Sequence, residues 1–225
     1  MVPLSDKKSG SPIPTVTYAL IGLNVLIFLW DRGGALFGPS VTFSDLAMRP
    51  LDVVRAIRGQ DDSFQLVTIF TSMFLHGGIV HLLGNMLYLL TFGSGVEWGM
   101  GSWRFSLYYL FWGVAAAAAQ IFVDPSSTAP MVGASGAIGG ALGAYFLLFP
   151  GNRLEILIPF VPVPVEAPAW ALLGSWFLFQ VFVRQEGVAS WAHVGGFLAG
   201  MITILVMGGR KRALKDLNFE ESPFA

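Results

Sequence analysis

Cysteine is absent from the 225-residue sequence, and charged residues are scarce. Without a thiol, the chain has no cysteine nucleophile, disulfide bond or thiolate metal ligand. Charged residues make up 12% of the chain, against about 25% in a usual soluble domain, while 54% are hydrophobic and the mean hydropathy is +0.65. This composition does not suit a surface in water, so it indicates a protein whose solvent is a lipid bilayer.

Basic residues are too few to indicate a nucleic-acid partner, because the formal net charge is −1. The C-terminal run "RKRALK" directly follows an apolar stretch, which is typical of a cytoplasmic membrane flank. The first 14 residues are polar and contain proline, and they lack the pattern of a cleaved signal peptide. We therefore expect the first apolar segment to be retained.

Six apolar segments predict the fold class: all-α, a polytopic membrane protein built as a six-helix bundle. The segments are residues 15–30, 79–96, 103–123, 133–149, 167–183 and 190–207. The expected organisation is a cytoplasmic N-terminal segment (1–14), a membrane domain (15–208) and a cytoplasmic tail (209–225). The long first loop, about 31–70, mixes charged and apolar residues and is expected to be structured at the membrane interface.

The placement of lysine and arginine predicts the orientation. One side would carry eight basic residues: Lys7, Lys8, Arg104, Arg153, Arg210, Lys211, Arg212 and Lys215. The other side would carry five: Arg32, Arg49, Arg55, Arg58 and Arg184. Because basic residues favour the cytoplasmic side, both termini are expected in the cytoplasm.

Polar residues are rare in these segments, and four of them are predicted to lie at one depth. His81 and Asn85 come early in the second segment, Ser135 starts the fourth, and His193 comes early in the sixth. All three segments run from outside to inside in this topology, so the four side chains fall in one slab near the outer surface. Ionisable groups at membrane depth are costly and therefore point to function.

Glycines share helix faces with these polar residues. His193, Gly196 and Gly200 lie on one face of the sixth segment, and Gly136 lies beside Ser135 on the fourth. Glycines three or four residues apart allow helix backbones to approach closely, although simple packing alone also explains such a pattern. The two faces together predict a serine and a histidine within about 3 Å, as a nucleophile and its base require.

This constellation predicts acyl transfer. Ser135 would be the nucleophile and His193 the general base and acid. The Ser135 backbone N–H, the Asn85 amide and the His81 imidazole would be the oxyanion donors. By topology, Asp124 and Glu186 are the nearest candidates for an acid behind His193, and a two-residue dyad is preferred to a triad.

Metal chemistry is the main chemical alternative, because histidine is a common zinc ligand. His76 and His81 are five residues apart with no glutamate between them, which does not fit the His-Glu-x-x-His arrangement. We therefore predict no catalytic metal and no cofactor.

The stretches "HGGIVHLLGNMLYL", "VEWGMGSWRF", "GASGAIGG" and "AHVGGFLAG" resemble the rhomboid family of intramembrane serine proteases in sequence and order. The resemblance covers residues 66–207 and implies a basic prokaryotic form with six helices around a water-filled cavity. It also implies the Ser135–His193 dyad, oxyanion assistance from His81 and Asn85, and a hole shaped by Gly133. Structural roles are implied for His76, Glu97 and the Gly101–Ser102 pair.

The resemblance further implies the partners and the location. The substrates would be transmembrane proteins cut near the outer end of a single span, in the inner (plasma) membrane. Many members carry an aromatic ring four residues after the serine, where this chain has Gly139, so His193 would be oriented from another helix. The alternative functions are an inactive relative that binds or chaperones membrane helices, and a channel or transporter. The oligomeric state is left open.

Overall fold

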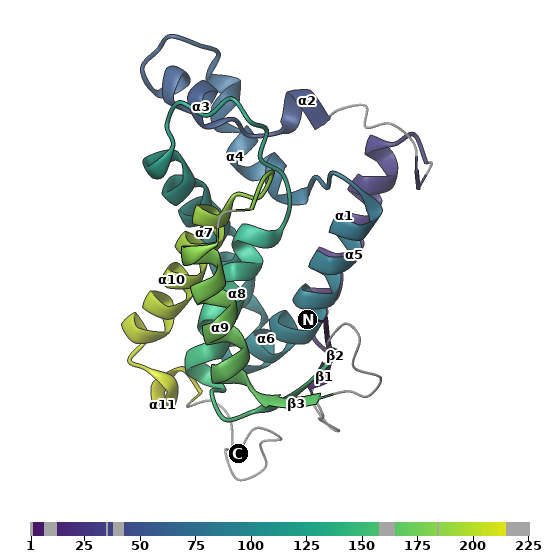
Figure 1. Ribbon diagram of the computed structural model, residues 1–225, viewed down its shortest axis with the longest axis vertical. Coiled ribbons are helices and arrows are strands. Elements are labelled where there is room, and N and C mark those ends of the chain that lie inside the picture. The colour runs from purple at the N-terminus through teal and green to yellow at the C-terminus, as the bar shows by residue number, and fades with distance from the viewer. Residues whose placement is uncertain are drawn as a thin grey trace.

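Helices make up most of the protein, which we describe from a computed structural model (Figure 1). The structure describes residues 2–6, 13–34, 36–37, 43–157, 165–183 and 185–214. Within these residues, six long helical segments are α1 (Thr15–Asp31), α5–η3–α6 (Ile79–Tyr88, Leu89–Gly93 and Ser94–Met100), α7 (Ser102–Val123), α8 (Ser135–Leu148), α9 (Ala169–Phe182) and α10 (Ser190–Val206). The bounds lie within about four residues of those predicted, so the helical membrane-protein fold is confirmed.

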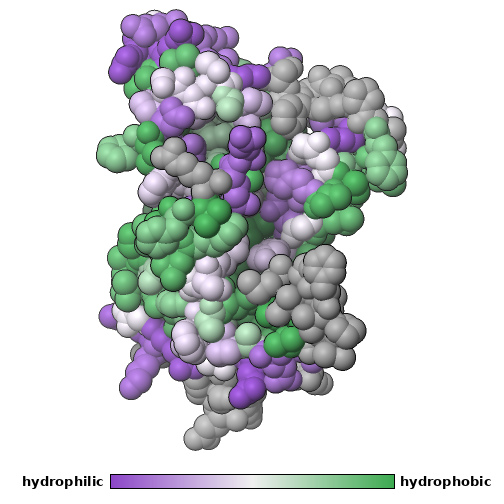
Figure 2. Space-filling model, viewed as in Figure 1, coloured by the Kyte–Doolittle hydropathy of each residue, from purple (hydrophilic) through white to green (hydrophobic). Residues whose placement is uncertain are grey.

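The surface and the helix lengths fit a bilayer that is thinner than average. Figure 2 shows hydrophobic surface across the middle of the molecule and hydrophilic surface at both ends. In the described chain, only Ile79–Met100 and Ser102–Val123 are long and apolar enough to cross a membrane by length and composition alone. The apolar helices α8 and α9 have 14 residues each, a rise of about 21 Å against about 30 Å of hydrocarbon. Local thinning of the bilayer accommodates such short helices.

The first loop is structured, as predicted. It contains α2 (Phe43–Leu46) and α3 (Pro50–Ile57), followed by a helical run of η1 (Ser63–Leu66), α4 (Thr68–Thr71) and η2 (Ser72–Phe74). Met48 and Val53 are buried with Ala117 of α7, and the backbone of Met48 pairs with that of Met131 just before α8. The loop therefore packs on the bundle and contacts the segment that leads into Ser135.

A small antiparallel sheet was not predicted. Its strands are β1 (Val2–Asp6), β2 (Arg153–Leu157) and β3 (Val165–Pro168), in the order β1-β2-β3. The sheet and α11 (Arg210–Ala213) lie at one end of the molecule, and α2 and α3 lie at the other (Figure 1). The chain thus begins and ends its described part on the same side of the bundle, next to the basic residues of α11.

The centre of the bundle is the contact between α8 and α10, and it depends on glycine. A Cβ added at Gly196 would overlap the carbonyl oxygen of Gly136, and one at Gly200 would overlap that of Gly140. The ring of Trp112 on α7 fills the space beside Gly140. The predicted glycine faces therefore bring two helix backbones into direct contact, which places the first turns of α8 and α10 side by side.

A buried carboxylate joins α1 to α6 and α7. Glu97 is 3% exposed, and it accepts hydrogen bonds from the backbone N–H of Val16 at 2.9 Å and from that of Thr17 at 2.7 Å. The hydroxyl of Ser102 donates to the same carboxylate at 2.7 Å. These bonds satisfy free N–H groups at the start of α1, so Glu97 ties the start of α1 to α6 and to the start of α7.

Candidate active site

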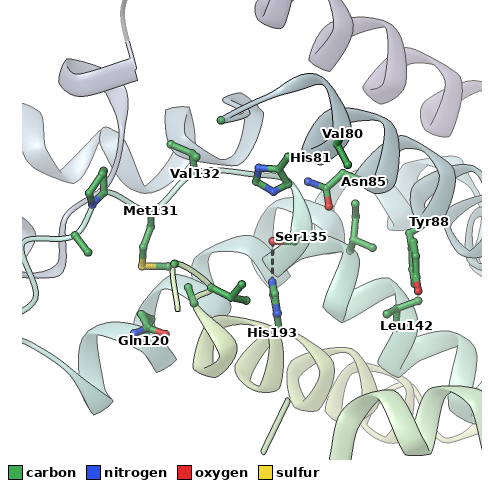
Figure 3. A pocket seen from close by; sticks show the side chains of 18 of the residues that line it. Val80, His81, Asn85, Tyr88, Gln120, Met131, Val132, Ser135, Leu142 and His193 are labelled. Carbon is green, nitrogen blue, oxygen red and sulfur yellow. Dashed lines mark hydrogen bonds between the residues drawn. The ribbon is translucent and has the colours of Figure 1, made fainter. Parts of the chain in front are cut away.

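A cavity of about 910 Å³ opens among α5, α7, α8, α9 and α10. Its lining includes the four polar residues that were predicted to share one slab: His81, Asn85, Ser135 and His193. Figure 3 shows these side chains turned toward one another from three helices, with the segment of Met131 and Val132 beside them. The structure thus brings the predicted constellation together at one end of the bundle.

Ser135 and His193 are hydrogen-bonded. Ser135 is the first residue of α8, and His193 lies in the first turn of α10. The distance from His193 Nε2 to Ser135 Oγ is 2.9 Å (Figure 3), within the range that proton transfer between a nucleophile and its base requires. This contact follows from the glycines below it, since they set the separation of the two helices.

The other ring nitrogen of His193 contacts a residue that the sequence reasoning missed. Nδ1 lies 2.9 Å from Oε1 of Gln180 on α9, so an amide stands behind the histidine and not Asp124 or Glu186. A polar side chain in an otherwise apolar helix is expensive in a membrane. That cost was a sequence signal for Gln180 that could have been used.

An aromatic ring on another helix also lies against His193, as expected from the departure at Gly139. The Trp176 ring centroid is 5.8 Å from that of His193, with the planes tilted by 37°. Gly139 itself has no room for a ring, because a Cβ there would already be 3.0 Å from the His193 carbonyl oxygen. The backbone of α10 occupies the space that an aromatic side chain at Gly139 would need.

Asn85 and His81 line the cavity opposite His193, and Gly133 lies against both of their side chains. The Asn85 side-chain nitrogen is buried and has no hydrogen-bond partner, so it is a donor available to a ligand in the cavity. Gly133 has a φ of +120°, and a Cβ at this position would lie 2.8 Å from the His81 ring and 3.4 Å from the Asn85 amide nitrogen. Only glycine gives this backbone conformation and leaves the two donors unobstructed.

His76 lies behind His81, outside the cavity lining. Its ring is 1% exposed and meets the His81 ring edge-on at a centroid distance of 5.1 Å. Burial lowers the pKa of His76 to about 3, so the ring is uncharged at neutral pH. The His76 backbone carbonyl accepts a hydrogen bond from Arg32 at 3.0 Å. These contacts place His76 in the packing behind His81, and its structural role stays a prediction.

Metal-ligating side chains do not cluster in the described part of the chain. No group of three or more histidine, aspartate or glutamate side chains is arranged there to hold a metal ion. The polar side chains that line the described cavity near Ser135 are the imidazoles of His81 and His193 and the amide of Asn85.

This geometry defines a membrane helical bundle with a serine–histidine pair in a cavity. Comparison with known proteins assigns the family. The Rhomboid domain family model matches residues 63–210, and the chain belongs to the rhomboid family. Members of this family are membrane-embedded and are generally intramembrane serine proteases, although some are inactive.

Named relatives come from bacteria, plants and fungi. The chain is 31% identical over 196 residues to Rhomboid protease GluP of Bacillus subtilis, covering 87% of this chain and 35% of the relative. It is 31% identical over 182 residues to RHOMBOID-like protein 4 of Arabidopsis thaliana, covering 78% of this chain and 41% of the relative. It is 29% identical over 195 residues to Rhomboid protein 1, mitochondrial, of Saccharomyces cerevisiae, covering 83% of this chain and 51% of the relative. The chain therefore spans about a third to a half of the length of these relatives.

Proposed function

We propose that this protein is an intramembrane serine endopeptidase that cleaves transmembrane segments with a Ser135–His193 dyad. The observation that carries the proposal is the 2.9 Å contact between Ser135 Oγ and His193 Nε2 at the wall of a 910 Å³ cavity. A histidine that only packs between helices would need neither a serine hydroxyl on its ring nitrogen nor a cavity beside it. Membership of a family of generally active serine proteases supports the same conclusion.

The proposed reaction proceeds in two halves. Ser135 Oγ attacks the substrate carbonyl carbon while His193 Nε2 takes the hydroxyl proton. The tetrahedral intermediate collapses, the C–N bond breaks, and the leaving amine takes that proton from Nε2. Water then attacks the acyl-enzyme with the same base, which releases the new carboxyl terminus and restores Ser135.

The oxyanion would be stabilised by three donors. Ser135 opens α8, so its backbone N–H belongs to the first helical turn, whose N–H groups have no acceptor within the helix. Asn85 contributes its unpartnered amide nitrogen, and His81 faces the same space across Gly133. In a cavity with low-dielectric walls, such prearranged donors contribute more than they would in water.

The proposed substrates are membrane proteins, because the cavity lies within a bundle whose outer surface is apolar. A peptide bond inside a helix is shielded by its own hydrogen bonds. A substrate whose span contains helix-breaking residues should therefore unwind into the site more readily. No cofactor or nucleic acid takes part in the proposed reaction.

The test is a cleavage assay with purified protein in detergent and a model single-span substrate. The expected result is one cut near one end of the span, unaffected by a metal chelator. Intact substrate at every enzyme concentration, from protein that is shown to be folded, would instead support an inactive relative that binds membrane helices.

Asn85→Ala should lower kcat by roughly 100-fold and leave residual activity, because one oxyanion donor of several is removed. KM should change little, since the donor acts mainly in the transition state. Asn152→Ala is the control, because this amide bonds to Tyr145 near β2, away from the cavity lining. Wild-type kcat in Asn85→Ala would remove Asn85 from the oxyanion site.

We also infer that both termini are cytoplasmic and that the cavity opens on the extracytoplasmic side of the plasma membrane. The basic residues of α11 and Arg153 of β2 lie at the end opposite α2 and α3 (Figure 1). Lys7, Lys8, Arg184 and Lys215, which entered the sequence prediction, lie outside the described residues. A C-terminal reporter that is active only in the cytoplasm should be active, and a periplasmic reporter fused there should not. The reverse pattern would overturn this orientation.

A further inference from the structure

Gln180 is an exceptional residue of α9. The helix is apolar except for Ser175 and Gln180, and the Ser175 hydroxyl donates to the Leu172 carbonyl of its own helix at 2.9 Å. Gln180 is 7% exposed and points inward, where its Oε1 lies 2.9 Å from His193 Nδ1. A buried amide is costly in an apolar helix, and this one contacts a ring nitrogen of the proposed base. Its position therefore indicates a function that involves His193.

We propose that Gln180 is the positioning residue of the dyad: it fixes the tautomer and orientation of His193 in place of a carboxylate. This inference rests on the proposed function. Gln180 Oε1 accepts a hydrogen bond from Nδ1–H, so the Nε2 lone pair faces Ser135 Oγ. The opposite tautomer would put a proton on Nε2, and His193 could not take the proton of Ser135.

The geometry assigns a second contact to the same face of α9. Trp176 and Gln180 are four residues apart and lie one above the other on the helix surface. Trp176 lies against the His193 ring while Gln180 holds its Nδ1, so one helix restrains both the tilt and the rotation of the imidazole. The place of α9 beside α10 therefore determines whether the base is aligned with Ser135.

An amide suits this position better than a carboxylate because it carries no net charge. A carboxylate in an apolar surrounding would have to lose its hydration shell, which disfavours its charged form. The amide dipole orients the ring without that penalty, and it still stabilises the imidazolium that forms during proton transfer. Gln180 would therefore fix the tautomer of His193 as the carboxylate of a catalytic triad does, but without a charge.

The test compares Gln180→Met and Gln180→Glu with wild type and Ser135→Ala in the cleavage assay, with kcat, KM and the pH–rate profile measured. Gln180→Met keeps the length of the side chain but accepts no N–H, and it should lower kcat roughly 10- to 100-fold with KM within about twofold. Gln180→Glu keeps the acceptor and should recover most of kcat. Its carboxylate favours the imidazolium, so the acidic limb of its profile should move to higher pH.

The matched control is Leu178→Met, a methionine two residues away on the exposed side of α9, which should leave kcat unchanged. Wild-type kcat in Gln180→Met, with active wild type and inactive Ser135→Ala, would overturn the role of Gln180 and leave the proposed function intact. Inactive wild type would instead overturn the proposed function. If thermal unfolding shows that Gln180→Met is unfolded, Gln180→Glu decides: an acidic limb at the wild-type pH would contradict the proposal.

Discussion

Ser135→Ala is expected to abolish cleavage of a transmembrane substrate, with kcat lowered by at least about 10⁴-fold. The hydroxyl is the only group on the first turn of α8 that can form the acyl-enzyme, and it already lies 2.9 Å from His193 Nε2. Alanine fits the same space without overpacking, so the variant should fold like wild type. Product formation with purified protein in detergent measures the effect.

His193→Ala should be equally inactive, and the double variant no worse than either single one. Residues that act as one unit lose nearly the whole effect at the first substitution. Ser175→Ala is the control, because this serine on α9 is exposed and bonds only within its own helix in the described structure. A Ser135→Ala protein that cuts at the wild-type rate would show that another group is the nucleophile.

The second large effect is expected on stability, from Gly200→Val at the contact of α8 and α10. Any side chain at this position overlaps the Gly140 carbonyl oxygen, and a valine adds two more carbons to that clash. The helices must separate, at a cost of about 3 kcal/mol or more in the free energy of unfolding. Because the same contact aligns Ser135 with His193, activity should fall with stability.

Gly22→Val on α1 is the matched control, since nothing lies within 4 Å of a Cβ built there. Thermal unfolding of both variants in the same detergent measures the difference. We expect Gly22→Val to melt close to wild type and Gly200→Val far below it. Equal melting temperatures would contradict the view that glycine packing sets the distance between the two helices.

The spans and the pairing of serine with histidine could be predicted because each has a periodic signal. Apolar length marks the helices, and glycines at helical spacing mark the faces that touch. Gly196 and Gly200 share the face of His193, and the structure brings this face against Gly136 and Gly140. Two local patterns therefore determine a long-range contact.

The sheet could not be predicted in this way. Its pairing of Val2–Asp6 with Arg153–Leu157 joins segments far apart in the chain. Arg153–Leu157 alternates between polar and apolar residues, but it is only five residues long, and Val2–Asp6 has no such pattern. Non-local pairing of short strands is decided by the surrounding fold. The sequence therefore predicted a polar N-terminal segment without a strand, and the structure has β1 there.

Gln180 was missed for a different reason. As a polar residue in an apolar helix it could have been marked for a role, but its partner could not be named. The contact with His193 depends on how α9 is rotated and shifted along α10, and no residue spacing within α9 encodes that register. Gly139 gave a partial signal, since its missing side chain predicted that His193 would be oriented from another helix. Trp176 meets that expectation, and the structure adds Gln180 beside it.

The central claim is that Ser135 is a nucleophile activated by His193, and covalent labelling tests it most directly. A fluorophosphonate reacts with activated serine hydroxyls, and peptide mass spectrometry locates the adduct. We predict one adduct on Ser135 in wild-type protein and none in folded His193→Ala. An adduct on another serine, or equal labelling of Ser135 without His193, would contradict the claim.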